Sequence, residues 1–374
     1  MLKGIHLTLL IGPAAPVPAP QPVTDALVSA QVTNGLTRSG FQLVFGLSKQ
    51  SLLSRALLPA GFFDPGVRVI LVVTVGPIPE VLIDGIITRQ EVAPGNQAGE
   101  GKLTITGEDL SVLMDVISLK EFRYPALPAP AIVALILARY AVFGIIPLVI
   151  PPIFNDVPIP TDRIPSQSGT DLEYMRKLAT DNGHVFFIQA GPAPGANVAY
   201  WGPDIRLPIP QPALNVNMDA HTNVESLTFS LDGLVKKLVV YLIYDPVTHK
   251  IALPVPVPNI SLLRPPLGAR IPVPLKVEFN DDVAKKNAVQ AIAQALAKTA
   301  ESTDAVTANG TLDVLRYGQT LKARQIVGVR GAGLAYDGLY YVRSVTHNLK
   351  RGEFKQNFTL SRDGLVSITP TVLP

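Results

Sequence analysis

The sequence predicts a mainly β protein in which a smaller α/β module lies between two β modules. Short apolar segments separated by Gly, Pro and Asn turns fill roughly the first 115 residues and return from about residue 219. The stretch between them has apolar residues at helical spacing and recognisable helix ends. With 374 residues, 47% hydrophobic and 16% charged, the chain can form two or three domains with their own cores, and the composition argues against disorder.

The first β module is expected over residues 1–118. Its segment 67–75 is almost purely Val, Ile and Leu, which is typical of a strand covered on both faces. Asn34 and Gly35 form a turn dipeptide that is able to adopt positive φ. Short strands separated in this way indicate a barrel or a sandwich. The expected strands are 5–11, 25–33, 41–45, 67–75, 81–90 and 102–106, with the last two paired through the loop 94–101.

The α/β module is expected over residues 119–218. A helix should begin at Pro130, where the missing N–H is not needed, and should end near Gly144. Thr170 and Glu173 have the spacing of a capping box that starts a second helix, and Gly183 is its expected C-terminal stop. A strand at 185–188 should pack on the apolar face of this helix, which is formed by Leu172, Met175, Leu178 and Ala179.

The second β module is expected over residues 219–374. The stretch 254–274 alternates proline with apolar residues, so it should be an edge or a connector, because proline cannot donate to a strand ladder. An amphipathic helix is expected near 281–301. The clearest strands are 339–349 and 354–362 around a turn at 350–353, and others are expected at 227–231 and 238–244, joined through Asp232 and Gly233.

Two apolar segments could be mistaken for membrane signals. Residues 1–20 have the faint outline of a signal peptide, but the apolar run contains His6 and Thr8, so a first β-strand is favoured and no signal peptide is expected. Residues 131–150 nearly reach the length of a bilayer span, yet Arg139 near the middle would cost a few kcal/mol there. A buried helix is the better interpretation, and no membrane insertion is expected.

Charge and cysteine content exclude further classes of site. The net charge of +3 arises from 32 basic and 29 acidic residues, so nucleic-acid recognition is not expected. The chain has no cysteine, which excludes disulfides and thiolate metal sites and fits assembly in a reducing cytoplasm.

The sequence offers no catalytic, cofactor-binding or metal-binding residue. Its five histidines, at 6, 184, 221, 249 and 347, lack metal-ligand spacing, and no Gly-x-Ser-x-Gly elbow occurs. The segment 99–102, Gly-Glu-Gly-Lys, departs from a phosphate loop, because Asn96 stands where glycine is required and Leu103 replaces the Ser or Thr. The pairs Asp281-Asp282 and Glu121 with Asp115 favour capping or solvated roles.

Two long segments resemble a known family. Residues 168–187 combine an Asp-Leu-Glu opening, an Arg-Lys-Leu-Ala core, a glycine and a pair of phenylalanines. Residues 337–347 read Asp-Gly-Leu-Tyr-Tyr-Val-Arg-Ser-Val-Thr-His and are followed by Phe-Thr-Leu-Ser-Arg at 358–362. Both are similar to the phage late control protein D family of baseplate hubs, whose fold also forms the hub portion of type VI secretion spike proteins. The shorter segments 39–43 and 106–110 are similar as well.

The resemblance implies a structural protein and not an enzyme. Members of the family carry two tube-like β-barrels per chain, which flank a smaller α/β domain, and assemble as trimers with a pseudo-sixfold ring. The partners implied are further copies of the chain, a threefold spike on one face, a sixfold inner tube on the other, and baseplate wedge proteins. The implied location is the bacterial cytoplasm during assembly and then the baseplate of a contractile phage-like particle.

Three other classes stay open from the sequence alone. They are an outer-membrane or other β-barrel protein, a β-rich carbohydrate-active enzyme, and a plain tail-tube subunit, which would need only one barrel. A pocket with two carboxylates at glycosidase separation would favour the enzyme. Residues that face the lumen of a hub cannot be assigned without the strand register, because a slip of one residue exchanges the two faces of a strand.

Overall fold

The computed structural model describes residues 4–13, 15–95, 101–152, 157–161, 164–206, 209–235, 237–241, 255–256, 265–273, 275–280 and 304–369. Within these residues the chain is mainly β, as the sequence predicts. The helix expected near 281–301 and part of the Pro-rich stretch 254–274 lie outside them. None of the described helices is both long and apolar enough to cross a membrane.

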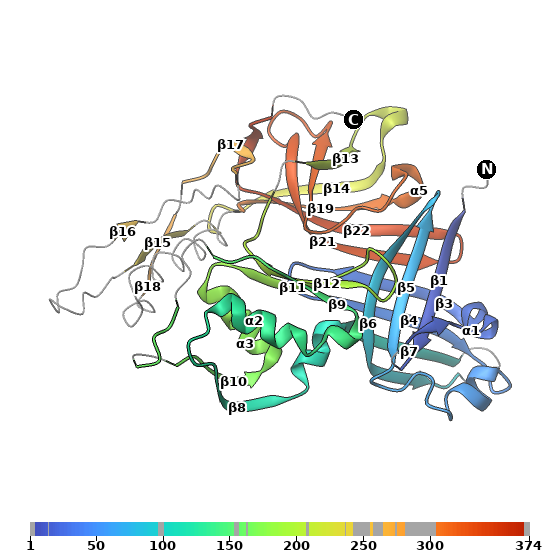
Figure 1. The fold of residues 1–374 in the computed structure, drawn as a ribbon. Helices are drawn as coiled ribbons and strands as arrows, with labels where there is room; N and C mark the ends of the chain where they lie inside the picture. The colour runs from blue at the N-terminus through green and yellow to red at the C-terminus, as the bar shows by residue number, and fades with distance from the viewer. Residues whose placement is uncertain are drawn as a thin grey trace.

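Strands from both ends of the chain build the largest sheet, which has 13 strands among the described residues (Figure 1). They are β1 (Ile5–Gly12), β2 (Val17–Pro18), β3 (Leu27–Asn34), β4 (Ser39–Leu47), β5 (Arg68–Val75), β6 (Ile78–Ala93), β7 (Gly101–Asp109), β13 (Pro210–Asn215), β14 (Val224–Leu231), β19 (Val306–Asp313), β20 (Ile326–Arg330), β21 (Gly338–Lys350) and β22 (Glu353–Arg362). The main path through the sheet is β14-β19-β22-β21-β3-β4-β7-β6-β5-β1-β2, and β20 joins β13 to β21.

Pairing and burial confirm the predicted strands, except that Asp25 and Ala26 belong to a short helix (Gln21–Ala26) and residues 242–244 lie outside the described part of the chain. In β5 every residue from Arg68 to Val73 is buried, as a strand covered on both faces requires. In β22 the buried Phe354 and Phe358 alternate with the outward-facing Asn357. The turn after β3 forms as well, closed by a 2.9 Å bond from the Gly35 N–H to the Arg38 carbonyl, although neither Asn34 nor Gly35 has positive φ.

The α/β module follows its predicted helix signals. The Thr170 hydroxyl accepts from the Glu173 N–H at 3.2 Å, and the Glu173 carboxylate accepts from the Thr170 N–H at 3.0 Å. Gly183 follows the helix with φ of 70°. Pro130 is the second residue of the first helix and not its first, and that helix ends at Ala138 and not near Gly144, which instead follows a separate 3-10 turn. The elements are β8 (Ser118–Arg123), α2 (Ala129–Ala138), β9 (Ile145–Val149), β10 (Ser166–Thr170), α3 (Asp171–Asp181), β11 (Val185–Ala190) and β12 (Asn197–Gly202).

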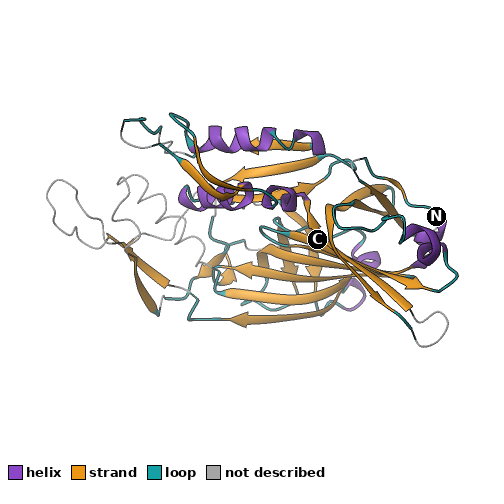
Figure 2. Ribbon diagram, turned by 90° about the horizontal axis from the view of Figure 1, so that it is seen from below, coloured by secondary structure: helices purple, strands orange, loops and turns teal. Residues whose placement is uncertain are grey.

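The strands and helices of this module form their own layers. One sheet has the order β11-β12-β9 and another pairs β8 with β10. Figures 1 and 2 place α2 and α3 next to each other on one side of the molecule. Short elements that the sequence analysis did not identify are α1 (Gln21–Ala26), α5 (Val314–Tyr317), a π-helical turn (Leu53–Leu57) and 3-10 turns at Leu110–Asp115, Ala141–Phe143 and Asp219–His221.

The remaining described strands lie in small sheets. β14 and β15 follow each other through Asp232 and Gly233, as expected, but they do not pair with one another. β15 instead lies between β16 and β18, and β17 pairs with β23. Their bounds are β15 (Lys237–Tyr241), β16 (Val255–Pro256), β17 (Gly268–Arg270), β18 (Lys276–Asn280) and β23 (Leu365–Ser367).

The two β modules share one hydrophobic core. A single cluster of buried side chains extends from Leu9 and Phe45 in the N-terminal part to Phe354 and Leu360 in the C-terminal part. A second cluster lies in the α/β module around Met175 and Trp201. The seam between the β modules is the antiparallel pairing of β21 with β3, from Val345 opposite Asn34 to Lys350 opposite Ser29.

The 13-stranded sheet contains the same strand arrangement twice. The first unit consists of β1, β3, β4, β5, β6 and β7, and the second unit consists of β13, β14, β19, β20, β21 and β22. In chain order each strand of the first unit has a counterpart in the second: β3 pairs with β4 as β14 pairs with β19, and β6 lies between β5 and β7 as β21 lies between β20 and β22. The relative direction of paired strands differs in one place, since β13 runs parallel to β20 whereas β1 runs antiparallel to β5.

Two pairs of ladder irregularities occur at matching places in the two units, whereas the shifts of β6 against β5 and of β13 against β20 have no counterpart. β6 is bulged at Thr88 against β7, and β21 is bulged at Arg343 against β22. β3 is bulged at Val28 against β4, and β14 at Glu225 against β19. A bulge fixes the register of a strand. Aligning the bulges therefore pairs the residues of the two units one by one.

The entry into β5 and into β20 supports the same alignment. The Gly66 N–H donates to the Ile87 carbonyl at 2.8 Å, and the Arg324 N–H donates to the Val342 carbonyl at 2.8 Å. Gly66 has φ of 97° and Arg324 has φ of 63°, so both take the left-handed conformation that is uncommon for a residue with a side chain. The chain thus contains an internal structural repeat, although its sequence shows no visible repetition.

Candidate functional site

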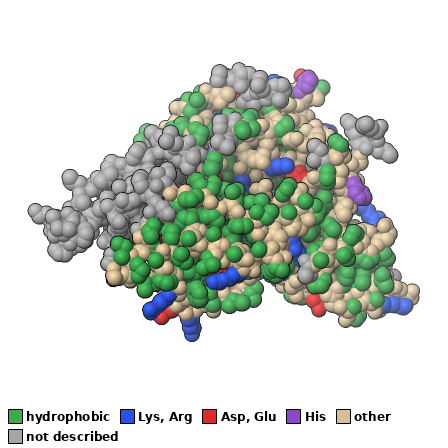
Figure 3. Space-filling model, in the orientation of Figure 1, with side chains coloured by type: hydrophobic (Ala, Val, Ile, Leu, Met, Phe, Trp, Pro, Cys, Tyr) green, Lys and Arg blue, Asp and Glu red, His purple; other side chains and the backbone are tan. Residues whose placement is uncertain are grey.

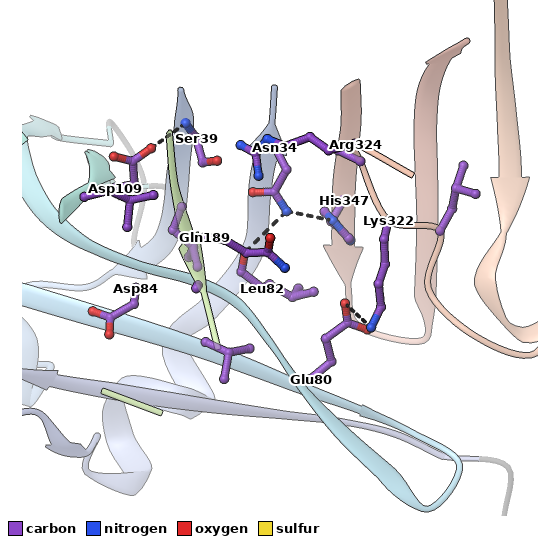
Figure 4. A pocket seen from close by; sticks show the side chains of 16 residues that line it. Asn34, Ser39, Glu80, Leu82, Asp84, Asp109, Gln189, Lys322, Arg324 and His347 are labelled. Carbon is purple, nitrogen blue, oxygen red and sulfur yellow. Dashed lines mark hydrogen bonds and ion pairs between the residues drawn. The ribbon is translucent and has the colours of Figure 1, made fainter. Parts of the chain in front are cut away.

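A small polar cavity lies where the two units and the α/β module meet (Figure 4). Its walls come from β3, β4, β6, β7, β11, β21 and the segment 321–324. The cavity has a volume of about 60 Å³. That is room for a few waters, and far below the roughly 300–1,000 Å³ of sites that hold small molecules.

His347 is the histidine of this cavity and is fully enclosed. Its Nε2 lies 3.3 Å from the Asn34 amide nitrogen across the seam, and its Nδ1 lies 3.1 Å from that of Gln356. Burial lowers the pKa of His347 to about 3, because the protein interior disfavours the charged ring. The imidazole is therefore neutral at pH 7 and both ring nitrogens have polar neighbours.

Two carboxylates at the cavity are occupied by structural bonds. Asp84 accepts two bonds from the Arg68 guanidinium, at 2.7 and 2.6 Å, and one from the Asn197 amide at 2.8 Å. This buried group ties β12 of the α/β module to β5 and β6. Asp109 accepts from the backbone N–H of Ser39 at 2.7 Å, which fixes the start of β4. Both carboxylates therefore hold neighbouring elements together.

Further polar contacts join the three parts of the chain around the cavity. Lys322 of the second unit lies 3.5 Å from the Glu80 carboxylate of the first. Arg324 donates to the Leu36 carbonyl at 3.1 Å, and its guanidinium lies 4.1 Å from the ring centre of Phe187 in the α/β module. The cavity is a junction between modules, and its polar groups set how they sit together.

The residues considered for chemistry from the sequence lie apart. No group of three or more His, Asp or Glu side chains suited to a metal ion occurs in the part of the chain that the structure describes. Asp115 accepts a bond at 2.7 Å from the hydroxyl of Thr170, the N-cap residue of α3, and the structure gives no contact between Asp115 and Glu121. Lys102 pairs with Gly46 in the β4–β7 ladder, whereas 96–100, His249 and Asp281-Asp282 lie outside the described residues.

The larger feature is an uncharged polar surface on the outer side of the shared sheet, here called the polar face. It continues across the seam, where the hydroxyls of Thr33 and Thr346 are 3.1 Å apart and the Gln31 amide donates to Asn348 at 3.0 Å. The side chains that form it are Gln31, Thr33, Ser226, Thr228, Asn309, Thr311, Ser344, Thr346, Asn348, Asn357 and Thr359.

The polar face is ordered by bonds between strands. Thr311 donates to Asn357 at 3.0 Å, and Thr359 donates to Asn309 at 2.9 Å. Charged side chains lie at its margin, where Lys355 is paired with Glu225 at 2.9 Å. Such a surface is hydrated and carries little net charge, so it offers neither an electrostatic nor a large apolar site to a passing molecule.

A second exposed surface is apolar and lies on the α/β module. Figure 3 shows hydrophobic side chains gathered there, with few charged ones between them. Val142 is 83% exposed, and Ile146 and Leu148 of β9 are 53% and 47% exposed. β9 is the edge strand of its sheet, so this side of the module has the composition of an interface.

Comparison with known structures identifies the fold. A tail protein from Neisseria meningitidis MC58 is similar with a TM-score of 0.63 and 14% identity, over 96% of this chain and 98% of that protein. The fold is shared with phage tail proteins. No protein-family model matches the sequence, and no curated protein matches it either.

Type VI secretion proteins have the same fold. A chain in the Francisella PdpA–VgrG complex is similar with a TM-score of 0.59 and 9% identity. The match covers 100% of this chain and 55% of that one. The E. coli c3393 protein, a type VI component described as similar to the bacteriophage T4 tail proteins gp27 and gp5, gives 0.55 and 12% identity over 93% and 77%. The resemblance to baseplate hub proteins is thus confirmed at the level of the fold.

Sequence reasoning missed the polar face and the junction. The alternation of Ser, Thr and Asn in segments 307–311, 344–348 and 355–359 was visible, but its continuity across five strands depends on the register. The buried partners of Asp84 come from positions 16 and 113 residues away, which no local pattern could reveal.

Proposed function

We propose that this chain is the structural hub in the baseplate of a contractile phage-like injection machine. It would act as a homotrimer that joins a threefold spike to the sixfold inner tube. The observation that carries the proposal is the internal repeat, in which two equivalent units stand side by side in one sheet. The fold shared with phage tail and type VI secretion proteins supports it.

The repeat suits a symmetry adapter because it doubles the symmetry of the assembly. With two units in each chain, three chains present six similar units in a ring. The two units would be the tube-like barrel domains, over 1–118 and 219–374, and residues 119–218 would form the α/β domain between them. Each subunit of a threefold partner could then bind one chain, and each subunit of a sixfold tube could stack on one unit.

The polar face is the surface best suited to line the bore of this ring. It covers four strands of the second unit (β14, β19, β21 and β22) and β3 of the first unit, so in a ring it would occur once in each chain around the axis. Hydroxyl and amide side chains keep water in place and do not attract a charged or apolar cargo. Spike and tube would contact the two rims, and baseplate wedge proteins would contact the outside. Assembly would occur in the bacterial cytoplasm.

Purification of the tagged chain from its native cells, followed by electron microscopy, tests the proposal. We expect sheathed tubes with threefold density for this chain at the spike end. A lone monomer without tube or spike partners, or recovery of the chain only with membranes, would contradict it.

The position of the bore is tested by single-cysteine labelling, since the chain has no cysteine of its own. Thr359→Cys on the polar face should react with a small maleimide in purified particles and be protected from a maleimide coupled to a large polymer. Val142→Cys on the α/β surface is the matched control. If Thr359→Cys reacts with the large maleimide as readily as Val142→Cys does, the polar face lies outside the bore.

A further inference from the structure

In the described part of the chain, the two edges that are the counterparts of the β21–β3 seam have no partner strand. Inside the chain, β21 of the second unit pairs with β3 of the first. In the repeat, β6 is the counterpart of β21 and β14 is the counterpart of β3. β5 pairs only with the part of β6 from Ile78 to Ile86, so residues 88–93 are open on that side, and β14 pairs only with β19. Among the described residues neither edge has a second strand.

We propose that β6 of one copy pairs antiparallel with β14 of the next copy and thereby repeats the seam between chains. This inference rests on the proposed ring and names its subunit interface. The aligned bulges make Glu91 the counterpart of Thr346, and Ser230 the counterpart of Thr33. Because Thr346 lies opposite Thr33 within the chain, Glu91 of one copy should lie opposite Ser230 of its neighbour.

The side chains on the two edges agree with this register. Val92 would lie opposite Phe229, on the side of the sheet that faces the core. Val92 is 49% exposed and Leu231 is 41% exposed in the single chain, and the pairing would cover both. Glu91 and Ser230 would continue the polar face. A slip of one residue would place Val92, whose side of the sheet is fixed by the pairing of β6 with β7, opposite a residue of the polar face.

Charge is complementary one step further along. In the same register Arg89 of one copy faces Asp232 of the next, just beyond the end of β14. The Arg89 side chain is 72% exposed and has only Glu91 of its own strand as an ion-pair partner among the described contacts. Asp232 is exposed, and its own N–H continues the β14 ladder by donating to Ala305 at 2.9 Å. Opposite charges on paired strands stabilise the pairing.

The opposite end of the sheet is protected against such pairing, and β14 is not. The other terminal strand, β2, is only two residues long and lies in a stretch with prolines at 16, 18 and 20. β14 has eight residues, contains no proline, and its one charged residue, Glu225, is paired with Lys355. Proteins blunt edges that must stay unpaired, so an open β14 is the edge kept for a partner. Pro94, which has no N–H to donate, limits the expected pairing to residues 90–93 and 228–231.

Disulfide trapping in purified particles tests this interface. The variant Glu91→Cys/Ser230→Cys should form bonds between copies on mild oxidation, and the product on a non-reducing gel should be a covalent trimer. The positive control is Thr33→Cys/Thr346→Cys, which should oxidise within one chain because the two hydroxyls are 3.1 Å apart. The negative control is Glu91→Cys/Phe229→Cys, whose side chains would lie on opposite faces.

The outcomes separate this inference from the proposed function. If the control pair oxidises but Glu91→Cys/Ser230→Cys stays monomeric in particles with threefold hub density, the β6–β14 seam is wrong and the hub stands. If the particles lack threefold density for this chain, the ring fails and the seam fails with it. A charge exchange adds a second measurement: Arg89→Glu should lower the yield of trimer at least severalfold, and Arg89→Glu/Asp232→Arg should restore it.

Discussion

At the scale of single residues, buried polar groups hold the modules in place. The Asp84 carboxylate accepts hydrogen bonds from Arg68 and from Asn197, and all three residues are buried. Arg206 forms a two-bond pair with Asp304, at 2.9 and 3.0 Å, between the segments that lead into β13 and β19. Such groups favour one arrangement because any other leaves a buried charge unpaired, at a cost of about 3–5 kcal/mol.

His347 should make the stability of the chain depend on pH. Its pKa is lowered by burial from 6.5 to about 3, so the unfolded chain takes up a proton at this residue between those values and the folded chain does not. Stability should therefore be complete above pH 6.5 and fall as the pH decreases, with about 2 kcal/mol lost at pH 5 through this residue. Urea unfolding of the purified chain at pH 7 and pH 5 measures the loss.

The variant His347→Gln should show a smaller decrease in stability between pH 7 and pH 5, whatever its stability at pH 7. His221→Gln, at an exposed position, is the control and should keep the slope of the natural chain. An unchanged pH slope in His347→Gln would show that another group causes the acid sensitivity.

At the scale of elements, local sequence signals explain where helices begin, whereas pairing with the neighbouring strand explains where strands are bulged. The capping box of α3 is a local device, because Thr170 and Glu173 satisfy each other's backbone N–H groups. The bulges of β3, β6, β14 and β21 instead depend on the strand beside them. They bend each unit in the same way although the residues at the bulges, such as Val28 and Glu225, have nothing in common.

Thr170→Ala should lower the free energy of unfolding of the chain by about 1–2 kcal/mol, since it removes the cap of α3 and the bond to Asp115. Trp201, which lies in the same core cluster as the α3 residue Met175, provides the fluorescence signal for a denaturant titration. Thr170→Ser should retain most of the stability. A loss equal to that of the alanine variant would mean that the methyl group, not the hydroxyl, matters.

At the scale of the whole molecule, we expect the two units to unfold together. Their cores merge in a single cluster and their strands share one sheet. A perturbation in either unit should therefore reach the other.

Phe45→Ala in the first unit and Phe354→Ala in the second should each destabilise the chain by about 3–5 kcal/mol, because each side chain is buried in the shared core. Hydrogen exchange followed by mass spectrometry should show lower protection in both units for each variant. Thr228→Ala on the polar face is the control and should change protection little. Lower protection confined to the mutated unit would show that the units unfold independently.

The sequence by itself determined the local elements and the order of the modules. Alternation predicted β22, the all-apolar run predicted β5, and capping residues predicted α3, because each depends on neighbours within a few positions. Only the tertiary structure decided that β21 pairs with β3, that the repeat merges into one sheet, and that Asp84, Asn197 and His347 meet at a junction. These features join residues more than 100 positions apart, and such contacts are selected by the packing of the whole chain and leave no local pattern.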